Sequence, residues 1–508
     1  MRKLLLASAA MLGATSGLAM AQAPATVFSP TQGQTMMPAN PMTPSSSFDA
    51  SNSYGSMTNY VGAAAYSRLA APAPGTVVIH LGGKVEVDMN AQYTTNNQFL
   101  GQKTNPVTFG SYMRLYPGVD GMSTNGIRYG ASIELRENFP GSGAQQTAAL
   151  SPAPSPSTYA SSQTVFVRRA FTYLANDNVG IVRFGNSDGV IGLFDPCIFS
   201  SQCWDAGIGN FNGGQQQGNG VTGAAAIPFA FLAQAGAEYG NTKITYLSPQ
   251  FFGLDFGVQY APSMGNGYSA CTTAGGIGVA TTATTVGASC NSETTGLDAS
   301  RWFNQVGVGA RYQGVFGPVS FGAYAFYETA GKEDFFGAPA SFARGNSGGN
   351  KFDNLSFIAA ASYMAFTTGV GKVTASIDYI GGALNGQLAM RPSGGAPEHA
   401  EVAGLMYNNG PITLGVESEL VESQGANTLT GISQRHEIGV ALGGNYNLAP
   451  GLYLVGEYQY EIRHQGGFDF LANGNGAGAT GAGTSAYHAG LTRDAHGQAL
   501  VFATVVNW

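Results

Sequence analysis

Four cysteines are the residues of this chain whose type and spacing most directly suggest a covalent chemistry. Five residues separate Cys197 from Cys203, and Cys271 and Cys290 form a second local pair. Neither pair has a histidine nearby, so the spacing favours two disulfides over metal sites. Of the three possible connectivities, we expect the local pairing, Cys197–Cys203 and Cys271–Cys290.

The remaining reactive residue types give no pattern typical of an enzyme. The six histidines are scattered over expected strands and loops without the spacing of metal ligands. We find no serine-centred nucleophile turn and no glycine loop of the kind that cradles phosphate. We therefore expect no catalytic residue, no bound metal and no cofactor.

Charged residues are scarce and unevenly distributed. The 508-residue chain has 22 basic and 29 acidic residues, about 10% of the total, whereas soluble domains have about 25%. Segment 187–234 contains Asp188, Asp195 and Asp205 but no lysine or arginine. The formal net charge of −7 gives no support for nucleic-acid binding.

Composition narrows the fold to an all-β class. Beyond residue 20 no apolar run reaches the roughly 18 residues of a membrane-spanning helix. The 29 phenylalanines and 24 tyrosines argue against disorder, and 74 glycines with 23 prolines indicate many tight turns. A glycine-rich solenoid and a transmembrane barrel remain as alternatives.

Strict alternation of apolar and polar residues indicates the strands that must hold the charges. Between Val77 and Tyr93 the odd positions are almost all apolar, whereas the even positions include Lys84 and Glu86. The same period of two recurs in 127–136 and 412–420. One oily face and one charged face are typical of a strand between lipid and a water-filled lumen, although a soluble sandwich also buries an oily face.

The lengths of the connections favour the barrel. Sixteen strands are expected between 76 and 508, and short and long connections alternate between them. The short connections include 117–125, 175–178, 248–251, 313–318 and 408–410, and the long ones include 139–163, 187–234 and 262–303. A sandwich has no reason to sort its loops in this way, and a solenoid would show a fixed repeat. The sequence therefore predicts a transmembrane antiparallel β-barrel with short periplasmic turns and long external loops.

The beginning of the chain predicts export. Arg2 and Lys3 precede an apolar stretch and the small-residue site Ala19-Met20-Ala21, so we expect residues 1–21 to be a signal peptide. Residues 22–75 are rich in Pro, Ser, Thr and Met, which predicts a flexible arm; a plug or a partner-binding segment is the alternative. The barrel is expected to comprise residues 76–508.

Two hairpins and the first strand are the most specific stretches. The first hairpin contains Val167-Arg168-Arg169-Ala170-Phe171 followed by Gly180 to Gly185, and the second contains Ile244 to Pro249 followed by Phe252-Gly253-Leu254. Together with 76–93, these stretches resemble the sixteen-stranded, trimeric general-diffusion porins of Gram-negative outer membranes. The resemblance implies a homotrimer in outer-membrane lipid, whose partners are small hydrophilic solutes and ions.

The same resemblance implies that the third long loop, 187–234, folds into the lumen. It would place Asp188, Asp195 and Asp205 opposite a basic wall, and such a transverse field sorts solutes by charge. The expected wall residues are Lys84, Arg114, Arg128, Arg136, Arg168 and Arg183. The alternative for each of these residues is that it is an ordinary solvated charge of the lumen with no role in the constriction. By alternation Arg169 falls on the oily face, which predicts a snorkelling or subunit-interface residue.

We therefore expect a passive, water-filled channel with a weak preference for cations. The expected inner face, with Glu401 counted on it, and the third loop together carry ten basic and fifteen acidic residues. Two alternatives remain open. One is a sugar- or anion-selective channel lined by the inward aromatics Tyr112, Tyr116, Tyr324, Phe326 and Tyr453; the other is a barrel whose loops act as an adhesin or receptor.

Overall fold

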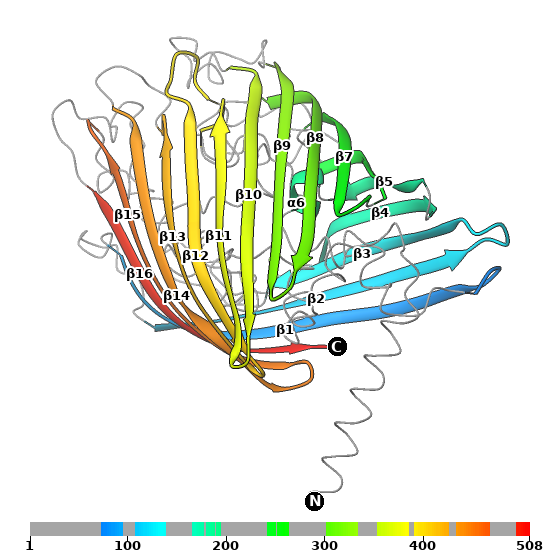
Figure 1. Cartoon of the computed structure of the whole chain (residues 1–508). Helices are drawn as coiled ribbons and strands as arrows, with labels where there is room; N and C mark the ends of the chain where they lie inside the picture. Colours follow the sequence, from blue (N-terminus) through cyan, green and yellow to red (C-terminus); the bar gives the residue numbers. More distant parts are fainter. Residues whose placement is uncertain are drawn as a thin grey trace, which may run out of the picture.

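The computed structural model describes residues 73–94, 107–138, 165–176, 179–187, 189–194, 241–249, 251–263, 301–333, 353–385, 391–425, 433–467 and 494–508. In these segments the chain forms antiparallel strands and one short helix (Figure 1). The elements are β1 (Val77–Thr94), β2 (Val107–Met122), β3 (Arg128–Asn138), β4 (Phe166–Asn176), β5 (Gly180–Ser187), α6 (Val190–Phe194), β6 (Asn241–Leu247), β7 (Leu254–Ser263), β8 (Arg301–Phe316), β9 (Val319–Glu333), β10 (Leu355–Thr368), β11 (Gly371–Gly382), β12 (Glu398–Asn409), β13 (Ile412–Ser423), β14 (Arg435–Ala449), β15 (Leu452–Gln465) and β16 (Ala495–Asn507).

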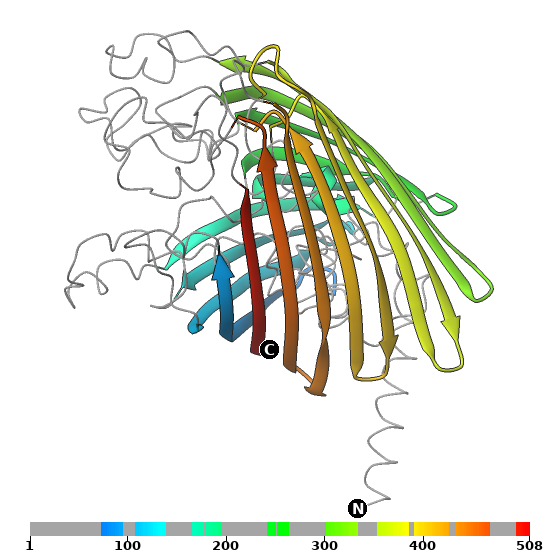
Figure 2. The same ribbon diagram turned by 90° about the vertical axis from the view of Figure 1, so that its left-hand side faces the viewer.

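The sixteen strands close into a single barrel. Each strand pairs with its neighbour in sequence, and β1 also pairs with β16, with Val87 opposite Thr504 (Figure 2). Closure leaves no strand with an unpaired edge, which is the condition for a sheet to stand in lipid. The predicted all-β barrel of sixteen strands is therefore confirmed.

The short turns gather at one rim. They join β2 to β3, β4 to β5 and each later even-numbered strand to the next odd-numbered one, and the chain end at Trp508 lies at this same rim (Figure 1). In bacterial barrels the short turns face the periplasm and the long loops face outward. No helix among the described residues is long and apolar enough to cross a membrane.

One predicted turn is misplaced. The expected connection 117–125 is wrong, because β2 continues to Met122 and Pro117 pairs with Leu81 inside the sheet. The turn lies at 123–127, where the Ser123 hydroxyl accepts the Ile127 N–H at 2.9 Å. Proline predicts a strand end because it lacks a ladder donor, but a strand position that needs no such donor tolerates it.

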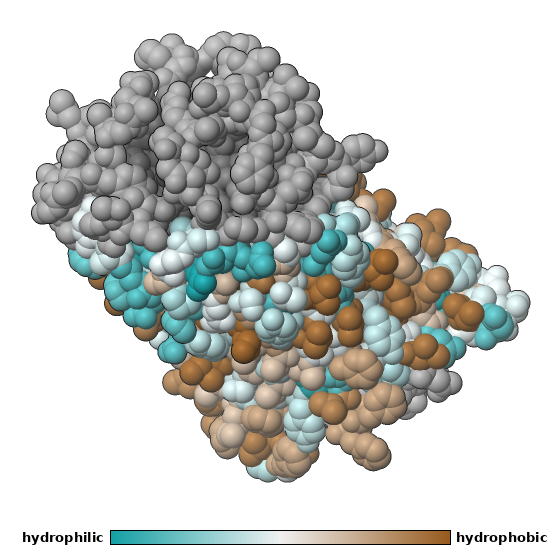
Figure 3. All heavy atoms as spheres, turned by 90° about the horizontal axis from the view of Figure 1, so that it is seen from above, coloured by the Kyte–Doolittle hydropathy of each residue, from teal (hydrophilic) through white to brown (hydrophobic). Residues whose placement is uncertain are grey.

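The two faces of the sheet have opposite character. On β13, Leu414 is 53% exposed on the outer face, whereas Glu417 is 1% exposed on the inner one. Figure 3 shows apolar side chains over much of the visible barrel exterior, with hydrophilic ones gathered beside the grey residues. This is the reverse of a soluble protein and places the oily face in lipid, as the alternation predicts.

A β-bulge on β4 overturns the expectation for Arg169. The register passes from Glu134 opposite Arg169 to Leu135 opposite Val167, so that Arg168 is skipped. The bulge reverses the alternation, and Val167 is 55% exposed outside while Arg169 is 2% exposed inside. The prediction of a lipid-facing or interface arginine was wrong because a period of two cannot reveal an inserted residue.

Glu401 also lies on the face opposite to the predicted one. It pairs with the lipid-facing Leu420, whereas its neighbour Val402 is buried and pairs with the inward Glu419. Small and apolar residues occupy both faces of β12, so that the alternation there is ambiguous. Glu401 therefore does not belong to the charges of the lumen.

Candidate functional site

The inner faces of β1 to β5 carry most of the predicted basic wall. Lys84, Arg128 and Arg183 are buried there, and Arg114 is half-buried opposite Lys84. Arg136 and Arg168 belong to β3 and β4, but their side chains lie outside the described residues, as do Asp188, Asp195 and Asp205. The structure thus brings four of the predicted wall residues to one side of the lumen, and the bulge adds Arg169 to them.

Carboxylates on the same strands partly neutralise this wall. Lys84 Nζ lies 2.7 Å from Glu86 Oε2, and Arg128 Nη2 lies 3.0 Å from Asp120 Oδ2. Asp120 also accepts a hydrogen bond from the Tyr173 hydroxyl. Arg169 Nη2 is 2.5 Å from Glu134 Oε2. Among the described side chains the wall therefore has five cations against three anions.

A second group of strands forms an acidic wall. The described inner faces of β11 to β15 carry six carboxylates and three basic side chains: Asp378, Glu398, Glu417, Glu419, Glu437 and Glu457, with Lys372, Arg435 and Arg463. Here Arg463 Nε lies 2.5 Å from Glu437 Oε1. In the ring of sixteen strands β11 is half a turn from β3, so the acidic wall lies across the lumen from the basic one.

The first turn of the third long loop is helix α6, and it packs on the inner face of the barrel. All five of its residues are buried, and it contacts β6, β7, β8 and β9 (Figure 1). Two glycines that face each other, Gly257 on β7 and Gly309 on β8, make room for Val190. A Cβ at Gly257 would lie 2.8 Å from Val190 Cγ1, and one at Gly309 would lie 3.1 Å from it. The absence of side chains at these two positions lets the helix approach the wall.

A polar network under α6 anchors it further. The Val190 N–H donates to Gln259 Oε1, whose amide nitrogen donates to Glu328 Oε2 at 2.9 Å. Gln305 donates to Glu328 Oε1 at 3.2 Å, and Asn241 donates to Gln305 at 2.9 Å. These four side chains come from β6, β7, β8 and β9. The sequence does not show that these four residues meet, because each is an unremarkable polar residue until the strands are in register.

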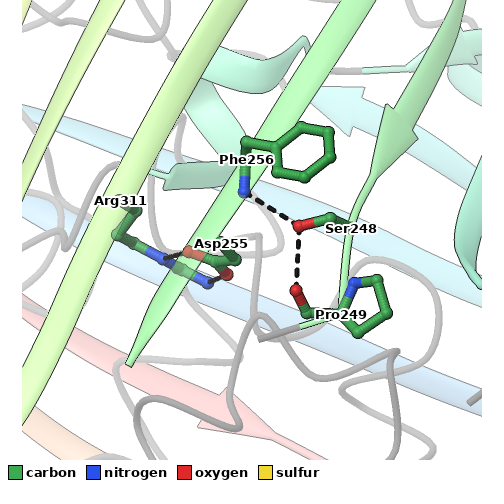
Figure 4. A network of polar contacts seen from close by, with 5 residues as sticks. All are labelled: Ser248, Pro249, Asp255, Phe256 and Arg311. Carbon is green, nitrogen blue, oxygen red and sulfur yellow. Dashed lines mark hydrogen bonds and ion pairs between the residues drawn. The ribbon is translucent and has the colours of Figure 1, made fainter. Parts of the chain in front are cut away.

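Arg311 joins the helix to the wall electrostatically. Its Nη2 and Nε lie 2.6 and 3.1 Å from the two oxygens of Asp255, as Figure 4 shows. The same guanidinium lies 4.8 Å from the ring centroid of Phe194, a cation–π contact. The Ser248 hydroxyl, also in Figure 4, accepts the Phe256 N–H at 2.9 Å and so fixes the adjoining turn. The cation–π contact holds the start of the third loop against β8, and the ion pair with Asp255 fixes the guanidinium that makes it.

The predicted inward aromatics are only partly brought together. Tyr324, Phe326 and Tyr453 are buried on the inner face, but Tyr453 belongs to a separate cluster with Val455 on β15. Phe326 packs against Phe357, with ring centroids 5.9 Å apart. Tyr116 is half-buried beside Gly82, and the Tyr112 side chain lies outside the described residues. The four cysteines, Cys197, Cys203, Cys271 and Cys290, lie outside them as well.

The chain is similar to known outer-membrane proteins. A family model described as Gram-negative porin matches residues 7–464. A mutant of Rh. blastica porin covers 85% of this chain and 100% of its own at 12% identity and a TM-score of 0.40. OmpTdeltaL8, a loop-deletion mutant of the Vibrio cholerae outer membrane protein OmpT, covers 85% and 99% at 11% identity and a TM-score of 0.42.

A comparison with curated proteins finds no match. The family match nevertheless spans most of the chain, and the closed barrel has the apolar exterior and charged interior that such a channel requires. The protein therefore belongs to the Gram-negative porin family and is a non-enzymatic diffusion channel of the outer membrane.

Proposed function

We propose that the channel passes small hydrophilic solutes and ions without a dedicated binding site and with a weak preference for cations. This proposal rests mainly on the charges of the lumen. Among the described side chains, both signs surround the pore, with a basic excess on β1–β5 and a larger acidic excess on β11–β15. Charges more than about 10 Å apart are largely screened at 0.1 M salt, so the mixed walls act locally and only the small acidic surplus gives a net preference.

Liposome swelling tests this proposal. For sugars of increasing size, we expect the swelling rate to fall smoothly with molecular size, because entry is limited by the width of the pore. No sugar should compete with another at saturating concentration. Saturation by one sugar or organic anion would contradict the proposal and favour a selective channel, and the absence of swelling would favour an adhesin or receptor barrel.

The packing of the aromatic residues supports a channel that does not select for sugars. A sugar-selective channel needs aromatic faces that follow one another along the path of the solute. Tyr324 and Phe326 instead belong to a buried cluster that includes the helix α6, and Tyr453 belongs to another on β15 and β16. The space next to Gly307 is filled by Phe326, whose ring lies 2.6 Å from the Cβ position there. The rings of Tyr324, Phe326 and Tyr453 therefore contribute to the packing of the inner wall.

We further propose a homotrimer, an export signal at residues 1–21 and a flexible arm at 22–75, followed by the barrel. The proposal of a homotrimer rests on the resemblance to the trimeric general-diffusion porins and on the family match. The proposals of an export signal and a flexible arm rest on the composition of residues 1–75. For the third loop, 187–234, we propose that Asp188, Asp195 and Asp205 face the basic wall at Lys84, Arg114, Arg128, Arg136, Arg168 and Arg183. The position of α6 on the inner wall supports this, because the loop starts there.

For the cysteines we propose two local disulfides. We expect that peptides from unreduced protein, analysed by mass spectrometry, contain cross-links Cys197–Cys203 and Cys271–Cys290. The reason is that an oxidising compartment joins cysteines that are close in sequence at the lowest entropic cost. Protein reduced and alkylated before digestion is the control. A cross-link between the two loops, or free thiols at all four positions, would contradict this pairing.

A further inference from the structure

Histidines far apart in the sequence meet on the outer surface of the barrel at the rim of the long loops. His436 is the second residue of β14 and His464 the penultimate residue of β15, and the register places them directly opposite each other. Cross-strand partners have Cβ atoms about 4.5–5.5 Å apart. Both alternate with inward residues, Glu437 and Arg463, so that both imidazoles point outward. The side chains are 43% and 46% exposed.

Each of the two imidazoles is oriented by its own carboxylate. His436 Nδ1 lies 3.0 Å from Glu422 Oε1 on β13, and His464 Nδ1 lies 2.7 Å from Asp494 Oδ1 at the start of β16. An ionised carboxylate only accepts hydrogen bonds, so Nδ1 carries the proton in each ring. The lone pair is then on Nε2, the nitrogen that does not face the carboxylate. In both rings the Nε2 lone pair is therefore the one that the carboxylate does not engage, and the two histidines lie opposite each other on paired strands.

We propose that His436 and His464 bind a divalent transition-metal ion, Zn²⁺, Ni²⁺ or Cu²⁺, through their Nε2 atoms. A histidine whose other nitrogen donates to a carboxylate is the usual arrangement of a metal-binding imidazole, and neutral imidazole suits these three ions. Among the described residues no three His, Cys, Asp or Glu side chains lie close enough together to hold a metal. The site therefore has two protein ligands, and water completes the coordination.

The structure also supplies a matched control. His399 on β12 lies on the same outer rim and pairs with Glu422, so its environment is similar. Its Nδ1, however, is 2.9 Å from the Tyr379 hydroxyl, which can donate, and no histidine lies opposite it. It has neither the oriented lone pair nor the second ligand. The proposal therefore assigns metal binding to the β14–β15 pair and excludes His399.

Titration of the full-length, detergent-solubilised protein, prepared without a polyhistidine tag, tests the site. The probe is Cu²⁺, followed by electron paramagnetic resonance, with Zn²⁺ as competitor. We expect one Cu²⁺ ion per chain with hyperfine coupling to two nitrogens. His436→Ala and His464→Ala should each weaken binding by more than about tenfold and lose one nitrogen coupling, whereas His399→Ala should bind as the unmodified protein does.

A second variant keeps the test decisive. Glu422→Gln retains both imidazoles and changes only the orienting group, so it should keep the two-nitrogen spectrum with affinity lowered about 10- to 100-fold. Circular dichroism of each variant should show the barrel intact, since all these side chains lie on the rim. Absence of Cu²⁺ binding by the unmodified protein, unchanged binding in the His436→Ala/His464→Ala double variant, or equal loss in His399→Ala would overturn the proposal.

Discussion

Replacing Gly257 by valine is expected to lower the single-channel conductance, because it pushes helix α6 away from the wall and into the lumen. The new Cβ alone would lie 2.8 Å from Val190 Cγ1, closer than side-chain carbons approach, and valine adds two methyl groups beyond it. Overpacking of this kind costs about 1–3 kcal/mol. The new Cβ also lies 2.8 Å from Leu247 Cδ2, and because the outer face of β7 borders lipid, we expect the helix to relieve these contacts by moving inward. Planar-bilayer recordings of single channels measure the effect.

Gly369→Val is the matched control for this variant. Gly369 lies in the turn between β10 and β11, and a Cβ there meets nothing within 4 Å. It introduces the same side chain without touching α6, so the conductance should equal that of the unmodified protein. Gly309→Ala should act in the same direction as Gly257→Val but more weakly, because its Cβ meets Val190 at 3.1 Å. Unchanged conductance in Gly257→Val would mean that α6 does not border the permeation path.

Neutralising the acidic wall is expected to move the channel toward anions. In the double variant Glu417→Gln/Glu419→Gln, two inward carboxylates of β13 lose their charge with little change of volume. An ion that passes about 4 Å from a unit charge in water gains about 1 kcal/mol, roughly a five-fold change in its local concentration. The cation-to-anion permeability ratio, obtained from reversal potentials in a salt gradient, should therefore fall. The effect should shrink as the salt concentration rises.

Glu401→Gln separates lumen charge from total charge in this experiment. It removes the same kind of side chain from the neighbouring strand β12, but Glu401 faces outward beside Leu420. The reversal potential should therefore stay that of the unmodified protein. A shift as large as that of the double variant would mean that the channel senses net charge rather than the wall.

The loop and the basic wall should act in opposite directions in the same measurement. Replacing Asp188, Asp195 and Asp205 together by asparagine should favour anions, whereas Arg128→Ala or Arg136→Ala should favour cations. A clear anion preference in the unmodified protein would contradict the proposed selectivity. No shift in the triple variant would instead mean that the third loop does not border the pore, and it would leave the contribution of β13 untouched.

Much of the fold follows from local sequence. Alternation along β1, β7 and β13 predicts which face each residue occupies, because a period of two is a property of one strand and needs no partner. The sorting of short and long connections predicts a closed barrel for a similar reason: it is a count along the chain. The failures occur where a pairing overrides the local pattern, as at the β4 bulge, at Pro117 in β2 and at Glu401 in β12.

By itself, then, the sequence determined a sixteen-stranded barrel with an oily exterior and an interior of mixed charge. Only the tertiary structure decided which side chains meet: Arg169 with Glu134, Arg311 with Asp255, and His436 with His464 across β14 and β15. It also decided that glycines on β7 and β8 seat α6. The physical reason is that the direction of a side chain is set by its own backbone, whereas its neighbours are set by the register between strands, which depends on bulges and turns that no single strand encodes.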